Sequence, residues 1–235
     1  MPKLYTGSSG FAYTSWKPAF YPAKLPSARF LEHYGSRLNA VEINYTFRRL
    51  PSASTLEKWV AATPEGFVFA IKANMRITHI LKLRNAQEAT ELFFRMIDPL
   101  RTARRLGPIL FQLGPTFKRD DQLLSDYLQI LPGDLRYTFE FRHASWLADP
   151  VYETLGEHNV SLCLAESEKL EIPKVVTADF VYHRLRKTEY SKETLAAIES
   201  QTRGQMDTGR DVFAFFKHEE DPQGALYAED LLARF

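Results

Sequence analysis

Cysteine is almost absent from this chain of 235 residues, in which Cys163 is the single example. One thiol excludes an internal disulfide and any metal site built from several cysteines, and it favours a reducing, cytoplasmic setting. Residues 1–10 lack the apolar region of a signal peptide, and the longest apolar runs, such as residues 67–71, are far too short to cross a bilayer. We therefore expect no membrane partner.

Several other signals are missing. The histidines show no HxH or HExxH spacing, which disfavours a zinc or di-metal site but leaves a carboxylate-bound magnesium ion open. The GSSG stretch at residues 7–10 lacks the GK[ST] end of a phosphate-binding loop. The charge is nearly balanced, at +1, so composition implies neither an acidic tail nor a chain-wide surface for polyanions. We expect no metal and no redox cofactor.

The residues that are present suffice for one large core. Hydrophobic residues make up 45% of the chain and aromatic residues 13%, without solenoid repeats or low-complexity segments. A single domain of this length is common among barrels, so we predict one domain over residues 1–235.

Strand-like and helix-like segments alternate along the chain. The predicted strands are residues 3–7, 40–47, 67–73, 108–113, 137–142, 161–166, 180–185 and 211–216. The predicted helices are residues 28–38 after a Ser27 cap, 54–63, 85–106 with a kink or break at Pro99, 121–131, 150–158, 191–206 and 225–235.

This alternation predicts an α/β fold, a (β/α)₈ TIM-like barrel with a parallel sheet inside a layer of helices. A doubly wound open sheet is the alternative, but it requires edge strands and none of the eight looks like one. Residues 167–179, interrupted by Pro173, are too short for a regular sixth crossover. The first βα loop, residues 8–26, is unusually long.

A strand buried on both faces explains an unusual pattern in residues 40–47, AVEINYTF. Glu42 and Asn44 share one face of this strand, and apolar residues occupy the other. A half-solvated sheet would give the same pattern, but in a barrel the inward polar groups meet at the carboxyl ends of the strands. The other late polar residues on such faces are Lys72, Gln112, Glu140, Arg142 and Arg184. We predict that they form one polar mouth.

Three of these residues are catalytic candidates. Glu42 and Glu140 are the candidate acid/base pair, because two carboxylates divide these roles when their surroundings separate their pKa values. The alternative is a pair of structural ion pairs, Glu42 with Lys72 and Glu140 with Arg142 or Arg184. Lys72 is a candidate Schiff-base or general-base residue if it is desolvated, and otherwise a counter-ion or anion anchor.

The candidate substrate ligands are Asn44, Gln112, Arg142, Arg184, His79, Tyr13 and Trp16. The arginine forks suit a carboxylate or phosphate. His79, just beyond the third strand, is a substrate ligand or a structural residue. Tyr13 and Trp16 lie in the long first loop, which forms either a lid over the mouth or a packed satellite core. After the last two strands, where this fold often binds phosphate, further cations stand at Arg186, Lys187, Lys217 and His218.

An ordered set of blocks resembles a known family. The blocks are GSSGFAYTSWKPAFYP, VEINYTF, TPEGFVFAIKA, ITH, GPILFQLGPTF, FEFRHASW and TADFVYHRL. Together they are similar to domain of unknown function family 72, also called YecE-like, over nearly the whole chain. The resemblance implies a TIM-like barrel and no settled activity. The chain departs from the family pattern at Arg48, Gly114, Glu166, Arg186, Lys187, Lys217 and His218.

Three functions fit these observations. The leading hypothesis is an enzyme performing acid/base chemistry, hydrolysis or isomerisation, on a small polar, anionic or sugar-like substrate. The second is a nucleic-acid binding or processing protein, in which aromatic residues stack bases and cations hold phosphates. The third is a barrel that binds a metabolite without turnover. The sequence leaves the substrate and the oligomeric state open.

Overall fold

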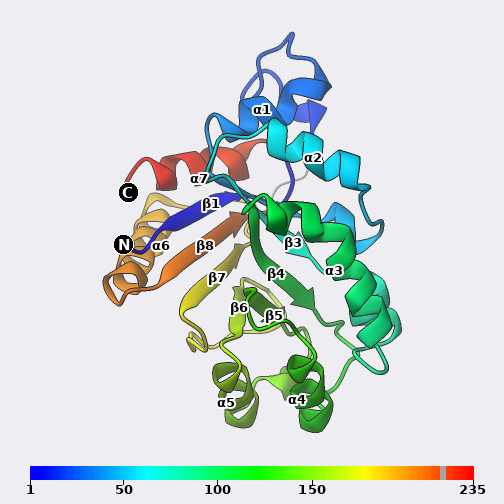
Figure 1. The fold of residues 1–235 in the computed structure, drawn as a ribbon. Coiled ribbons are helices and arrows are strands. Elements are labelled where there is room, and N and C mark those ends of the chain that lie inside the picture. The colour runs from blue at the N-terminus through cyan, green and yellow to red at the C-terminus, as the bar shows by residue number, and fades with distance from the viewer. Residues whose placement is uncertain (218–220) are drawn as a thin grey trace.

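Eight parallel strands form the centre of the computed structural model, which describes residues 1–217 and 221–235 (Figure 1). They are β1 (Leu4–Ser8), β2 (Ala40–Ile43), β3 (Val68–Lys72), β4 (Leu106–Gln112), β5 (Tyr137–Glu140), β6 (Ser161–Ala165), β7 (Phe180–Leu185) and β8 (Asp211–Phe216). Neighbouring strands follow the order β1-β8-β7-β6-β5-β4-β3-β2. The predicted TIM-like barrel is therefore confirmed, and its two end strands meet at a seam.

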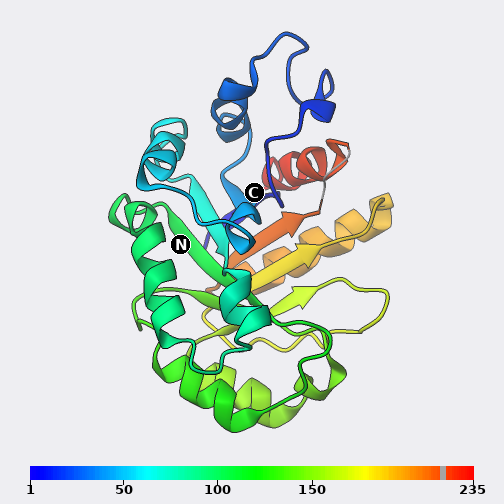
Figure 2. The same ribbon diagram turned by 90° about the vertical axis from the view of Figure 1, so that its right-hand side faces the viewer.

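Helices surround the strands. They are α1 (Phe30–Gly35), α2 (Ala53–Ala61), α3 (Gln87–Thr102), α4 (Asp121–Gln129), α5 (Asp149–Glu157), α6 (Lys192–Asp207) and α7 (Gln223–Leu232). Residues 166–179, between β6 and β7, contain no helix, so the sixth crossover is irregular, as predicted (Figure 2). None of the helices in the described part of the chain is both long and apolar enough to traverse a membrane.

Two helix predictions are wrong in detail. The predicted break at Pro99 is wrong, because Pro99 lies inside α3 and Ala103 N donates to Pro99 O at 3.1 Å; a kink there stays a prediction. Ser27 does not cap α1: a 3₁₀ turn, Ser27–Arg29, precedes that helix and makes no side-chain cap. Both differences are local and leave the strand positions unchanged.

Side chains close the seam between β1 and β2, both of which the structure describes in full. The Asn39 amide accepts from Thr6 N at 2.9 Å and donates to Leu4 O at 2.7 Å. The Tyr34 hydroxyl accepts from Ser8 N at 2.7 Å and donates to Ala40 O at 3.1 Å. These groups satisfy backbone atoms that a strand ladder would otherwise pair.

We expect Tyr34→Phe to lower the free energy of unfolding by about 1–3 kcal/mol, because it leaves the buried Ser8 N and Ala40 O without their shared partner. Urea unfolding measures the change. Tyr152→Phe is the control, since Tyr152 is half-buried on α5 and makes no side-chain hydrogen bond among the described residues. Equal stability of the two variants would contradict a role for the Tyr34 hydroxyl in closing the barrel.

The long first loop packs into the main hydrophobic core, so it is packed as the second alternative expected but is not a separate satellite. Trp16, Phe20 and Tyr21 are buried, and Trp16 stacks on Tyr21 with ring centroids 5.8 Å apart. Tyr21 in turn stacks on Phe30 of α1 at 4.1 Å. Trp16 is therefore not available to a ligand, and its assignment as a candidate substrate ligand is corrected. Its indole prefers the aromatic cluster because burial of such a large apolar surface is strongly favourable.

Candidate active site

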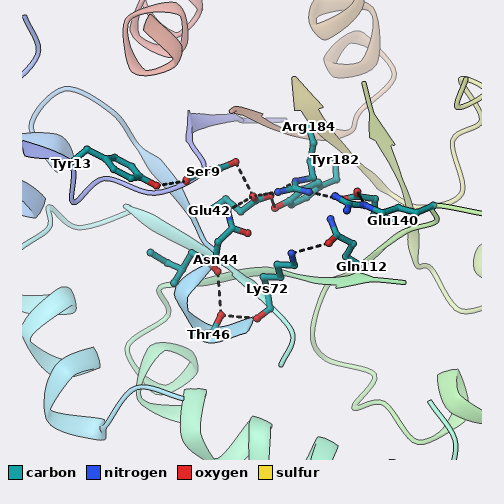
Figure 3. Close-up of polar contacts among 12 residues, drawn as sticks. Ser9, Tyr13, Glu42, Asn44, Thr46, Lys72, Gln112, Glu140, Tyr182 and Arg184 are labelled. Atoms are coloured by element: carbon teal, nitrogen blue, oxygen red, sulfur yellow. Dashed lines mark hydrogen bonds and ion pairs between the residues drawn. The ribbon is translucent and has the colours of Figure 1, made fainter. Parts of the chain in front are cut away.

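Three strands direct charged side chains into the barrel. Glu42 of β2, Glu140 of β5 and Arg184 of β7 are at most 3% exposed, and Figure 3 shows them meeting at one point. They occupy the inner alternate positions, where the residues closer to the amino ends of the strands are apolar, such as Ala40 and Tyr182. The sequence therefore places the charges together at the carboxyl ends.

Arg184 bridges both carboxylates. Its Nε and Nη2 donate to the two oxygens of Glu42 at 2.9 and 2.7 Å, and its Nη1 donates to Glu140 Oε2 at 2.5 Å. Arg142 Nε adds a bond to Glu140 Oε1 at 2.9 Å. The expected pairing of Glu42 with Lys72 is wrong: the planar fork of Arg184 matches a carboxylate in two places, whereas an ammonium does not.

Neutral hydrogen-bond donors also bind the carboxylate of Glu42. Tyr182 donates its hydroxyl at 2.8 Å, Ser9 donates its hydroxyl at 2.9 Å and the Asn44 amide donates at 3.3 Å. Burial opposes ionisation of Glu42, but Arg184 and these donors outweigh it and lower the pKa of the carboxyl. With its lone pairs occupied, Glu42 is held as an ionised anchor.

Glu140 is held ionised even more firmly. Burial would raise its pKa, but the charges of Arg184 and Arg142 lower it to about 2. A carboxylate with so low a pKa is a weak base near neutral pH, because efficient proton transfer needs a pKa near the working pH. The network of Glu42, Arg184, Glu140 and Arg142 is therefore best suited to fixing charge in place.

Lys72 lies beside this network without joining it. Its Nζ donates to Gln112 Oε1 at 2.9 Å and lies 4.1 Å from the centre of the Phe47 ring. Lys72 makes no ion pair in the described part of the chain, and it is 9% exposed. Burial, and then repulsion by Arg184, lower its pKa to about 8. The protonation of Lys72 thus changes within about one pH unit of neutrality.

His79 and Asn44 complete this side of the mouth. The His79 ring packs on Phe47 at 4.9 Å, and burial followed by the charge of Lys72 lowers its pKa. Asn44 reaches Glu42, although β2 ends at Ile43, before the predicted end at Phe47. The chain turns at Asn44 into a 3₁₀ turn, Tyr45–Phe47, so Asn44 is placed by the turn and not by strand alternation.

Ser9 and Tyr13 connect the first loop to the site. Ser9 N extends the β1–β8 pairing by donating to Phe216 O at 2.9 Å, which fixes the hydroxyl that Glu42 accepts. Tyr13 donates to Ser9 O at 3.2 Å, as Figure 3 shows, so it supports the site from behind. The half-buried Tyr13 acts on the site through Ser9.

Two residues that depart from the family pattern, Glu166 and Arg186, directly follow β6 and β7. Arg186 is partly buried, and burial, followed by repulsion from Arg184, lowers its pKa. Its Nη1 is buried without a hydrogen bond in the described part of the chain. Glu166 accepts from the backbone N of Arg186 at 2.7 Å and of Lys187 at 3.2 Å, and the Arg186 guanidinium forms no ion pair with any described carboxylate. His218 lies outside the described residues.

Other departures lie away from the charged network. Gly114 faces the His79 ring closely enough that an added Cβ would lie 3.4 Å from its Cδ2. Arg48 is exposed beside the 3₁₀ turn after β2.

Sequence reasoning missed three contributors to the site: Ser9, Tyr182 and Phe47. Tyr182 could have been found, because it shares the inner alternation of Arg184 two residues later. Ser9 and Phe47 lie in loops, where no periodicity predicts direction. Among residues 1–217 and 221–235, no cluster of three or more His, Cys, Asp or Glu side chains is placed to hold a metal ion.

The site and barrel match a family profile described as "Protein of unknown function DUF72" over residues 5–235. The chain belongs to the DUF72 family. A crystal structure of a DUF72 family protein from Thermotoga maritima superposes with a TM-score of 0.88 at 26% identity, covering 99% of this chain and 98% of the other. The resemblance seen in the sequence blocks is thereby confirmed.

Two curated relatives of this DUF72 chain are bacterial. UPF0759 protein YunF of Bacillus subtilis is 30% identical over 156 residues, which are 64% of this chain and 54% of the relative. UPF0759 protein YecE of Escherichia coli (strain K12) is 34% identical over 119 residues, which are 50% of this chain and 43% of the relative. The matched region thus spans about half the length of these relatives.

Proposed function

We propose that this DUF72 barrel is an enzyme that binds a small anionic substrate at its mouth and uses Lys72 to transfer a proton. The observation that carries the proposal is the charge balance of the mouth. Among the described residues, the charges that act on Lys72 and Arg186 come from Arg142, Arg184, Glu42 and Glu140, so this group of six holds four cations and two carboxylates, and Glu166 binds the backbone beside it. An anionic group would neutralise this excess.

Each residue has a role in the proposed reaction. Lys72 exchanges the proton, because its pKa of about 8 lies close to neutrality. Gln112 orients the ammonium through its carbonyl, and Arg142 and Arg186 hold the anionic group. Glu42 and Glu140 position Arg184, in place of the acid/base roles considered from the sequence. Hydrolysis or isomerisation of a polar, sugar-like or phosphorylated compound suits such a site.

We expect sulfate, used as a probe, to bind more weakly as the pH rises through about 8, because Lys72 then loses its charge while the arginines keep theirs. Calorimetry at a series of pH values measures this, and sulfate itself does not titrate in that range. The Lys72→Met variant should bind sulfate weakly and without a pH dependence. Strong, pH-independent binding by wild type and variant alike would contradict the proposal.

A binding barrel without turnover is the second candidate. The saturation of Glu42 and the low pKa of Glu140 favour it, because neither carboxylate is suited to accept a proton near neutral pH. Turnover separates the two candidates: the enzyme should lose it when Lys72 is replaced, whereas the binding barrel has none to lose.

A further inference from the structure

Two neighbouring loops at the mouth contain cations without acids. The loops after β2 and β3, residues 44–52 and 73–86, hold no Asp or Glu, whereas the loop after β4, residues 113–120, holds Asp120. The cations of the first two loops are Arg48, Arg49, Arg76, Lys82 and Arg84. The loop after β6, residues 166–179, instead holds four acids and two lysines. The β2–β3 side of the mouth is therefore more positive than the β6 side.

Four of these cations have no carboxylate partner. Arg48, Arg49, Arg76 and Lys82 are exposed and form no ion pair in the described part of the chain; we call these four residues the basic rim. Arginines on two outer helices are different, since Arg101 of α3 pairs with Asp134 and Arg203 of α6 pairs with Glu199. Uncompensated cations on neighbouring loops create a positive potential that attracts polyanions.

Large apolar side chains lie among the cations. Tyr45 is 50% exposed and Ile80 is 64% exposed, in the turns that follow β2 and β3. The two turns form one surface, because Asn74 Nδ2 donates to Thr46 O at 3.0 Å and the Phe47 and His79 rings are in contact. The surface also adjoins Lys72, whose ammonium faces the Phe47 ring.

We propose that the basic rim, together with Tyr45, binds single-stranded nucleic acid. Cations that track a phosphate backbone and an exposed aromatic ring that stacks a base are the two requirements of such binding. The near-neutral net charge and the small extent of the basic rim, which lies on two neighbouring loops, favour one strand over a broadly gripped duplex. This inference goes beyond the proposed function, because the rim needs no proton transfer by Lys72.

The first test is fluorescence anisotropy with a short labelled oligothymidylate at several salt concentrations. The double variant R48E/R76E should bind at least about tenfold more weakly, and its salt slope should fall by about 0.7 for each phosphate that is no longer neutralised. The control K58E/R104E makes the same charge change at Lys58 of α2 and at Arg104, before β4, both exposed and unpaired among the described residues. Equal weakening in both variants would mean diffuse charge attraction and would overturn the proposal.

The second test separates stacking from charge. Tyr45→Ala should weaken oligothymidylate binding about fivefold or more, since stacking on one aromatic ring contributes about 1–3 kcal/mol per base. Polyglutamate, a polyanion without bases, should bind more weakly than the oligonucleotide to wild type. Equal affinity for polyglutamate, or no effect of Tyr45→Ala, would overturn the assignment to nucleic acid.

A third variant makes the failures of the two proposals distinguishable. Lys72→Met should keep oligothymidylate binding within about twofold of wild type, because a single mouth cation supplies little of the attraction to the phosphate backbone. If Lys72→Met abolishes this binding, the strand is captured by the mouth and the rim proposal fails. Absence of pH-dependent sulfate binding in wild type, with oligothymidylate binding intact, would refute only the proposed enzyme site.

Discussion

Replacing Arg184 with methionine should lower the free energy of unfolding by about 3–5 kcal/mol, the cost of leaving buried charges without their partner. Arg184 is the shared cation of Glu42 and Glu140, both almost fully buried. Methionine fills a similar space without charge, so the loss reflects electrostatics more than a cavity. Urea unfolding at neutral pH measures the change.

The matched control is Arg101→Met. Arg101 pairs with Asp134 at 2.6 Å, but both side chains are about half exposed, so its removal should cost less than about 1 kcal/mol. Arg184→Met within about 1 kcal/mol of wild type would contradict the buried ion network.

The pH dependence of the same variant follows from Glu140. Its folded pKa of about 2 is below the unfolded value, so wild type has this stabilisation above the unfolded pKa and loses it as the pH falls toward 2. Without Arg184, the buried carboxylates protonate more readily. We therefore expect the stability gap between wild type and Arg184→Met to narrow as the pH falls through the carboxyl range, and a constant gap would contradict the assignment.

Turnover should fall by about 10²-fold or more in Lys72→Met, the usual contribution of a positioned proton-transfer group. Lys72→Arg should lose turnover equally, since a guanidinium keeps its charge and does not release a proton. It should nevertheless retain sulfate binding, now without the transition near pH 8. This pair of variants separates proton transfer from anion binding.

Mass spectrometry of a bacterial metabolite extract provides the assay while the substrate is unidentified. A compound consumed by wild type and by the exposed-site control Lys58→Arg should persist with either Lys72 variant. If Lys72→Arg consumes it at the wild-type rate, Lys72 transfers no proton. If wild type consumes nothing, the binding barrel without turnover becomes the better account of the mouth.

The placement of polar residues could be predicted where it depends on strand alternation. Glu42, Glu140 and Arg184 follow inward positions of three strands, and the structure brings them into contact. Strand alternation does not predict the direction of side chains in loops. Asn44 was therefore predicted to lie in a strand, but β2 ends one residue before it, at Ile43. Ser9 was not predicted, because the pairing of its backbone with Phe216 after β1 and β8 fixes its position.

By itself, the sequence determined the eight strands, the barrel and the end at which the charges gather, because these follow from local periodicity repeated along the chain. The pairing of Glu140 with Arg142 or Arg184 was predicted, but only the tertiary structure decided the partners of Glu42 and Lys72. Glu42 on β2 meets Arg184 on β7 across the barrel, and Lys72 on the adjacent β3 has no carboxylate partner in the described part of the chain. Closure of the barrel sets these distances, and the aromatic cluster that withdraws Trp16 from the mouth forms only once α1 packs against the first loop.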